Sequence, residues 1–280
     1  MNDFHFLGID SFILDSLKED IGTGDITTNS CVPETATSKG RFIAKEDGVI
    51  CGLPVLMRVF GLFDERVIIT PLVSDGDYLN KGSVIAEIEG PARSILTCER
   101  LALNLIQRLS GIATRTYETV KSIEGTNARI ADTRKTTPGL RVLEKYAVKC
   151  GGGSNHRFNL SDGVLIKDNH IVAAGSIGNA VSAVRENIPH TLKIEVETET
   201  MVQIDQALVA GADIIMLDNM TTEQMADAVR HIAGRAVTEA SGNMGDKNLR
   251  EVAGTGVDII SIGALTHTVR ALDISLKFYE

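Results

Sequence analysis

The residues best suited to chemistry gather in one basic stretch, from Arg129 to Lys167. This stretch holds eight Lys or Arg and only three Asp or Glu, whereas the whole chain of 280 residues has a formal net charge of −9. Cations that gather locally against the overall sign of a protein are typical of a site for a specific anion. The sequence therefore predicts that this stretch binds an anionic ligand.

Four of these cations lie beside Gly, Pro, Asn or His, where turns are expected: Arg134, Lys135, Arg157 and Lys167. Turns on a rigid scaffold carry binding and catalytic residues more often than the elements that they connect. Lys145 and Lys149 instead lie in the middle of a helical pattern, for which a solvated helix face is the simpler interpretation. We expect the first four side chains to contact the ligand.

The bulk composition excludes several classes of protein. Hydrophobic residues make up 43% and charged residues 23% of the chain, as in ordinary globular domains. A sequence pI near 5.2 argues against nucleic-acid binding. The sequence shows no signal-peptide pattern and no apolar run of membrane-spanning length, so we expect a cytoplasmic protein without membrane contact. The four cysteines form no CxxC pair, which favours free thiols over disulfides or a zinc site.

The first third of the chain predicts a small α/β domain. Residues 11–20 have the pattern of a short amphipathic helix, and the glycines of the following GTGD segment indicate an ordered turn. Between residues 38 and 90, short alternating apolar runs are broken by Asp-Gly and Lys-Gly pairs, as in small strands joined by tight turns. The pattern resembles the sandwich of biotinyl and lipoyl carriers, but no Lys lies at a hairpin tip as a carrier requires. We therefore predict a structural, barrel-sandwich-like α/β domain.

A long helix is predicted from Pro91 to about Ile123, where apolar residues recur at helical spacing. Thr97 is expected to cap its first turn. The domain boundary is expected inside this helix, which gives an N-terminal domain of residues 1–110 and a catalytic domain of residues 111–280. The last segment of the chain is expected to be a helix that packs back on the N-terminal domain.

Strand and helix patterns alternate after Asn127. Six apolar runs are expected to form strands, at residues 128–132, 163–167, 192–197, 212–218, 235–241 and 257–263. Helical patterns lie between them, and Pro138 is expected in the first turn of one of these helices. Apolar strands flanked by helices indicate parallel pairing with both faces of the sheet covered. The second domain is therefore predicted to be an open parallel (β/α) barrel of about six strand–helix units.

Polar residues follow each predicted strand at the same end, where such barrels carry their active sites. Cations follow the first two strands, carboxylates the next two, and Ser-Gly or Gly-Ala segments the last two. Arg and Lys clamp carboxylates or phosphates, and paired acids such as Glu197 and Asp218 suit Mg²⁺ or sugar hydroxyls. Backbone N–H groups at the Ser-Gly and Gly-Ala segments suit a phosphate. The combination predicts a phosphorylated sugar with a metal ion, together with a small organic anion.

Motifs along nearly the whole chain resemble those of the quinolinate phosphoribosyltransferase family, in family order. The matching segments are EDIGTGDITT, ERLALNLIQRLSGIAT, ADTRKTTPGLR, GGGSNHRFNLSDGVLIKDNHI, IEVE, IIMLDN, EASGN and SIGALTH. The resemblance implies an N-terminal α/β sandwich plus an open α/β barrel, in a homodimer whose active site is closed by the neighbouring subunit. It also implies that quinolinate and phosphoribosyl pyrophosphate react, with Mg²⁺, to give nicotinate mononucleotide, pyrophosphate and CO₂ in the de novo route to NAD.

The same resemblance implies roles for individual residues. Those expected to bind the substrates are Arg100 (from the neighbouring subunit), Thr133, Arg134, Lys135, His156, Arg157, Lys167, Glu197, Asp218, Ser241, Gly242, Asn243, Ile262, Gly263 and Ala264. The arginines, Lys167 and His156 would hold the dicarboxylate, and Lys135 would bridge the two substrates. Glu197 and Asp218 would hold the ribose and Mg²⁺, and these two acids with Lys135 are the expected catalytic residues. The Ser-Gly-Asn and Gly-Ala segments would hold the 5′-phosphate, although many family members have Gly in place of Asn243.

Three other functions fit parts of the sequence. A molybdenum-uptake paralogue of the family shares its fold, but the intact DTRKTTPGLR and NHR segments favour the quinolinate enzyme. A barrel aldolase or isomerase acting on a sugar phosphate would need a Schiff-base Lys or an isolated general base, and would leave four cations on two strands unexplained. A biotinyl-like binding module would account only for residues 38–90.

Overall fold

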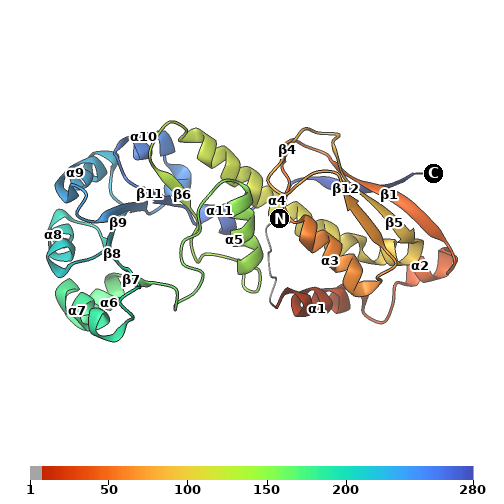
Figure 1. The fold of residues 1–280 in the computed structure, drawn as a ribbon, viewed down its shortest axis with the longest axis horizontal. Helices are drawn as coiled ribbons and strands as arrows, with labels where there is room; N and C mark the ends of the chain where they lie inside the picture. Colours follow the sequence, from red (N-terminus) through yellow and green to blue (C-terminus); the bar gives the residue numbers. More distant parts are fainter. Residues whose placement is uncertain (1–7, 280) are drawn as a thin grey trace. The chain divides into compact units, whose positions relative to one another are not determined.

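Residues 8–279 are described by a computed structural model of the protein, in which they form two compact units (Figure 1). The first unit contains residues 8–117, 137–152 and 268–279, and the second contains residues 118–136 and 153–267. This division differs from the predicted continuous domains. The chain returns twice to the first unit after residue 117, because a helix and the last strand are built into that unit.

A four-stranded antiparallel sheet forms the centre of the first unit. Its strand order is β12-β1-β5-β3, with bounds Ile274–Tyr279, Thr37–Ala44, Val84–Pro91 and Ile68–Pro71. A separate two-stranded ladder joins β2 (Gly48–Val49) to β4 (Tyr78–Leu79). These short strands and tight turns agree with the pattern in the sequence.

The end of the chain is a strand, so the predicted terminal helix is wrong. β12 pairs antiparallel with β1 from Ile274 to Tyr279. Its buried residues, Ile274 and Leu276, are two positions apart, with less buried residues between them. An alternation of period two places one face of a strand against a core, and a segment of six residues is too short to show a helical stripe.

Four helices complete the N-terminal part of the first unit: α1 (Ile9–Ile21), α2 (Ile26–Cys31), α3 (Leu53–Phe63) and α4 (Ala92–Ser122, which continues into the second unit). The GTGD turn ends with Asp25, whose Oδ1 accepts a hydrogen bond of 2.9 Å from the Thr28 N–H and caps α2. The sequence pattern missed α3, because its residues are apolar almost throughout. The cap predicted at Thr97 is also wrong, since α4 begins at Ala92.

Helix α5 (Arg141–Cys150) also belongs to the first unit. It begins three residues after Pro138, so the proline precedes the helix and does not lie in its first turn. The predicted solvated face holds for Lys149, which is exposed, but is wrong for Lys145, whose exposed fraction is 0%. Helix α5 is buried over more of its circumference than its apolar stripe indicates.

The second unit is built on a six-stranded parallel sheet, which confirms the open-barrel prediction. The strand order is β6-β11-β10-β9-β8-β7, with bounds Arg129–Ala131, Ile259–Ser261, Val237–Ser241, Ile214–Asp218, Ile194–Thr198 and Val164–Ile166. All six predicted strands are present. The edge strands β6 and β7 do not pair with each other, so the barrel is open.

Short helices follow these strands, and Figure 1 shows α7 to α10 along the outer side of the curved sheet. The helical segments are α6 (Asp168–Ala174), α7 (Ile177–Asn187), α8 (Met201–Ala210), α9 (Thr222–Ile232), η1 (Met244–Asp246), α10 (Leu249–Gly254) and α11 (Ala264–His267). Within residues 8–279, no helix has both the length and the apolar character needed to cross a membrane.

Strand register places the acidic residues on one face of this sheet. Glu197 pairs with Met216 and Met216 with Glu239, while Asp218 pairs with Ser241. Since paired residues in neighbouring strands point to the same face, these side chains and Glu195, two residues before Glu197, share the face opposite the one packed on the helices. The intervening residues on β8, β9 and β10 are buried.

Candidate active site

A cation and two acids meet at the carboxyl ends of β7, β8 and β9. Lys167 Nζ lies 3.6 Å from Glu197 Oε2. Burial raises the pKa of the Glu197 carboxyl, Lys167 opposes that rise, and the nearby Asp218 and Asp168 carboxylates add to it. Three predicted site residues from three strands are therefore close enough to interact electrostatically.

Asn219 and Gly242, which follow the strand ends Asp218 and Ser241, approach each other closely. Asn219 has a left-handed backbone (φ 54°), and its Nδ2 donates to Asp218 Oδ2 over 2.5 Å. Gly242 has φ +88°, and a Cβ at this position would lie 2.3 Å from Asn219 Oδ1. Only glycine fits both the conformation and the space. Asn243, which follows with φ 53°, is exposed at the start of η1.

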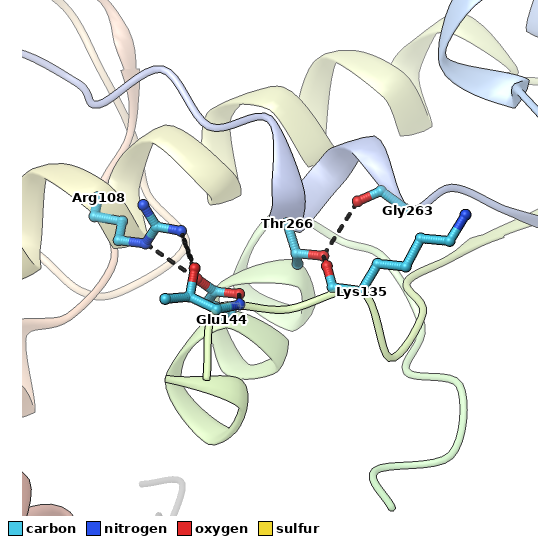
Figure 2. Close-up of polar contacts among 6 residues, drawn as sticks. Arg108, Lys135, Glu144, Gly263 and Thr266 are labelled. Carbon is cyan, nitrogen blue, oxygen red and sulfur yellow. Dashed lines mark hydrogen bonds and ion pairs between the residues drawn. The ribbon is translucent and has the colours of Figure 1, made fainter. Parts of the chain in front are cut away.

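Lys135 lies against the loop that follows β11 (Figure 2). The Thr266 hydroxyl donates to the Lys135 carbonyl oxygen at 2.8 Å and lies 3.2 Å from the Gly263 carbonyl oxygen. A Cβ on Gly263 would be 2.9 Å from Lys135 Cδ, so glycine leaves room for the lysine stem. Ile262 is buried and its N–H donates to the Ala131 carbonyl oxygen. The structure thus joins the predicted residues of the first and last barrel strands.

Two arginines form a cationic pair in the second unit. Arg134 and Arg157 each have a buried Nε without a hydrogen-bond partner in the described part of the chain. Burial, followed by the charge of Arg134, lowers the pKa of the Arg157 guanidinium. Arg157 is steadied by a hydrogen bond of 2.8 Å from its Nη1 to the Gly163 carbonyl oxygen. Two half-buried guanidiniums with open donors suit an anion that carries more than one charged oxygen.

The ring of His156 contacts other residues of the second unit. Its Nε2 lies 3.0 Å from Glu195 Oε2 and 3.7 Å from Glu239 Oε1. Its Nδ1 accepts the backbone N–H of Arg157 at 2.8 Å. Both ring nitrogens are therefore engaged within the second unit, and the predicted contact of His156 with a dicarboxylate stays a prediction.

Comparison with known proteins was made for the whole chain. A family model described as the N-terminal domain of quinolinate phosphoribosyl transferase matches residues 25–110, and one described as the C-terminal domain matches residues 112–277. The chain belongs to the quinolinate phosphoribosyltransferase family.

Curated relatives and solved structures agree with this assignment. A probable nicotinate-nucleotide pyrophosphorylase [carboxylating] of Bacillus subtilis (strain 168) is 50% identical over 92% of this chain and 89% of its own length. The corresponding protein of Mycobacterium leprae (strain TN) is 44% identical over 99% of both chains. The structure of nicotinate-nucleotide pyrophosphorylase from Francisella tularensis matches with a TM-score of 0.93 and 41% identity, over 97% of this chain and 96% of that one.

The remaining predicted residues occupy loops or helix positions whose contacts with a ligand stay predictions. Thr133 Oγ1 accepts the Lys135 N–H at 3.0 Å, so it shapes the turn that presents the lysine. Ala264 is the first residue of α11. Arg100 is exposed on α4 in the first unit.

The metal prediction rests on two acids. Within residues 8–279, two clusters bring three potential ligand side chains together: His156, Glu195 and Glu239, and Cys51, Asp75 and Cys150. Glu197 and Asp218 are in neither. A Mg²⁺ ion on this pair would need further oxygens from substrate or water, since it takes six ligands in an octahedron.

Sequence reasoning missed the connections among the site residues. It did not link Glu195 and Glu239 to His156, and it gave no role to Asn219 or Thr266. The alternation in the segment IEVE was the available signal, because residues two apart on a strand share a face. The roles of Asn219 and Thr266 depend on loop conformations that periodicity does not encode.

Proposed function

We propose that the protein transfers the phosphoribosyl group of phosphoribosyl pyrophosphate to quinolinate, with decarboxylation, to give nicotinate mononucleotide, pyrophosphate and CO₂ in NAD biosynthesis. The names of its relatives support this activity. The observation that carries it is the pair formed by Arg134 and Arg157, whose buried Nε donors have no hydrogen-bond partner among residues 8–279. A pyridine dicarboxylate offers the carboxylate oxygens that such a pair would bind.

The other residues fit the transfer step. As pyrophosphate leaves, the ribose carbon gains positive charge, which the carboxylates of Glu197 and Asp218 would stabilise electrostatically. Lys135 would lie between the two substrates, and the loops after β10 and β11 would bind the 5′-phosphate. The pyridine nitrogen is itself the nucleophile, so the protein's work is to position both substrates and to stabilise charge.

We propose Mg²⁺ as the cofactor. The donor set fits, because two carboxylates from adjacent strands lie close enough for the charge of Asp218 to raise the pKa of Glu197. When bound, Mg²⁺ would neutralise charge on the leaving pyrophosphate. Lys167, which lies 3.6 Å from Glu197, would supply positive charge on the acceptor side of the site.

The direct test is incubation with Mg²⁺, phosphoribosyl pyrophosphate and quinolinate labelled in its 2-carboxylate. Release of labelled CO₂ is expected with quinolinate, and nicotinate should not replace it as the acceptor. Arg134→Ala or Arg157→Ala should lower kcat/KM by about 100-fold or more, which corresponds to ~3 kcal/mol of lost transition-state binding. Arg230→Ala, at an exposed site on α9, is the matched control and should keep full activity. Full activity in Arg134→Ala would refute the assignment.

We also propose a homodimer in which Arg100 serves the site of the neighbouring subunit. Its exposure on α4 supports this role. Arg100→Ala and Lys135→Ala proteins should each be inactive. Mixing them should restore part of the activity, because a hybrid dimer would contain one site with both residues intact. Absence of rescue, with subunit exchange verified by mass labelling, would rule out a role in trans.

A further inference from the structure

Two buried carboxyls, Glu195 and Glu239, lie beside the half-buried ring of His156 within the second unit. Glu195 and Glu239 are 3% and 1% exposed, and the Oε1 atom of each has no hydrogen-bond partner among the residues that the structure describes. They lie on β8 and β10 and approach the ring of His156 from two strands. Burying two carboxylates is unfavourable unless protons or hydrogen bonds compensate, so this cluster requires an explanation.

Two hydrogen bonds of the His156 ring indicate which nitrogen carries the proton when the imidazole is neutral. The Arg157 backbone N–H donates to Nδ1 at 2.8 Å, so Nδ1 presents a lone pair and carries no proton. The proton of a neutral imidazole is then on Nε2, from which it is donated to Glu195 Oε2 at 3.0 Å. For a neutral ring, these two hydrogen bonds are satisfied together by the Nε2–H tautomer.

A metal ion does not explain the cluster. The three side chains offer ligand atoms within 4.8 Å of one another. However, Nε2 carries a hydrogen in this tautomer and has no lone pair for a metal. Burial and the neighbouring Glu195 raise the pKa of Glu239 to about 7, so this carboxyl keeps its proton at mildly acidic pH.

The same ring anchors the segment that carries Arg157. Ser154 bridges to Ala131 at the edge of β6, and the buried Asp132 accepts the backbone N–H of His156 at 2.8 Å and Asn155 Nδ2 at 2.6 Å. These contacts fix the backbone up to His156, and beyond Arg157 the Phe158 N–H donates to Asp162 Oδ2 at 2.8 Å. The next N–H, that of Arg157, depends on the imidazole.

We propose that Glu195 is a positioning residue for the anion site: it holds His156 as the Nε2–H tautomer, whose Nδ1 accepts the backbone N–H of Arg157 and so helps to position the Arg157 guanidinium. This proposal rests on the proposed function only for the identity of the anion, a pyridine dicarboxylate. In the opposite tautomer an Nδ1–H would face the Arg157 N–H, two donors would oppose each other, and the segment would shift.

Glu195→Met tests the proposal by removing the acceptor for Nε2–H while keeping the side-chain length. We expect ¹⁵N NMR of the histidine-labelled protein to show His156 as the Nε2–H tautomer in the wild type and as a mixture of tautomers in the variant. The KM for quinolinate should rise about tenfold or more, while the KM for phosphoribosyl pyrophosphate stays within about twofold. Glu195→Gln, whose amide oxygen can still accept the hydrogen bond, should restore both the tautomer and the KM. Glu186→Met, at an exposed position on α7, is the control.

Glu239→Gln provides a second test that does not depend on the folding of Glu195→Met. This change mimics the protonated carboxyl and should leave the tautomer and both KM values unchanged at pH 7. An Nδ1–H tautomer in the wild-type protein would overturn the proposal by itself. So would an unchanged quinolinate KM in a Glu195→Met protein whose tautomer has changed. The NMR measurement requires no catalysis, so an inactive protein that shows the expected tautomer would refute the proposed function and not the positioning role.

Discussion

The raised pKa of Glu239 predicts how stability changes with pH. Burial and the neighbouring Glu195 raise this pKa from 4.5 to about 7. The native state therefore keeps a proton that the unfolded chain releases, so the stabilising contribution is complete below about pH 4.5 and is lost as the pH rises to about 7. From the linkage relation, the free energy of unfolding should fall by ~2 to 3 kcal/mol between about pH 5 and pH 8 because of this one group.

Glu239→Gln removes that dependence, because glutamine has nearly the shape of the protonated acid and cannot ionise. Urea unfolding of both proteins at about pH 5 and pH 8 should show the variant gaining ~2 to 3 kcal/mol relative to wild type across this interval. Glu186→Gln, at an exposed site on α7, should follow the wild type to within ~0.5 kcal/mol at both values. If the free energies of unfolding of the wild type and of Glu239→Gln changed by the same amount between about pH 5 and pH 8, the buried, protonated state of the Glu239 carboxyl would be refuted.

Three further changes test the structure by urea unfolding. Arg108 pairs at 2.6 Å with Glu144, which is 0% exposed (Figure 2). Arg108→Met should therefore lower the free energy of unfolding by ~3 to 5 kcal/mol, because it leaves a buried carboxylate without its cation. The loss should be much smaller when Glu144→Gln is also present. Gly242→Ala should destabilise by ~1 to 3 kcal/mol and reduce kcat/KM, because the methyl group would displace Asn219; wild-type values of both would contradict the close approach. Asp25→Ala removes the cap of α2 and should lower the free energy of unfolding by ~1 kcal/mol, whereas a change below ~0.3 kcal/mol would argue against the cap.

The site was predictable where it depended on strand ends. Lys167, Glu197 and Asp218 each follow an apolar run in the sequence, and parallel strands bring their carboxyl ends to one edge of the barrel. The pairing of Glu195 with His156 was not predictable in this way. His156 lies in a loop whose path is fixed by a bridge to β6 and by the buried Asp132, both of which are tertiary contacts.

By itself, the sequence determined the six barrel strands and the residues at their ends, because hydrophobic periodicity and turn residues are local properties of the chain. Only the tertiary structure decided that the last segment joins the N-terminal sheet as a strand, that Lys145 is buried, and that the His156 ring contacts Glu195. Each of these depends on a partner distant in sequence or on the packing around the group. Six residues of alternating pattern specify a strand only when a sheet edge, here that of β1, is available to pair with them.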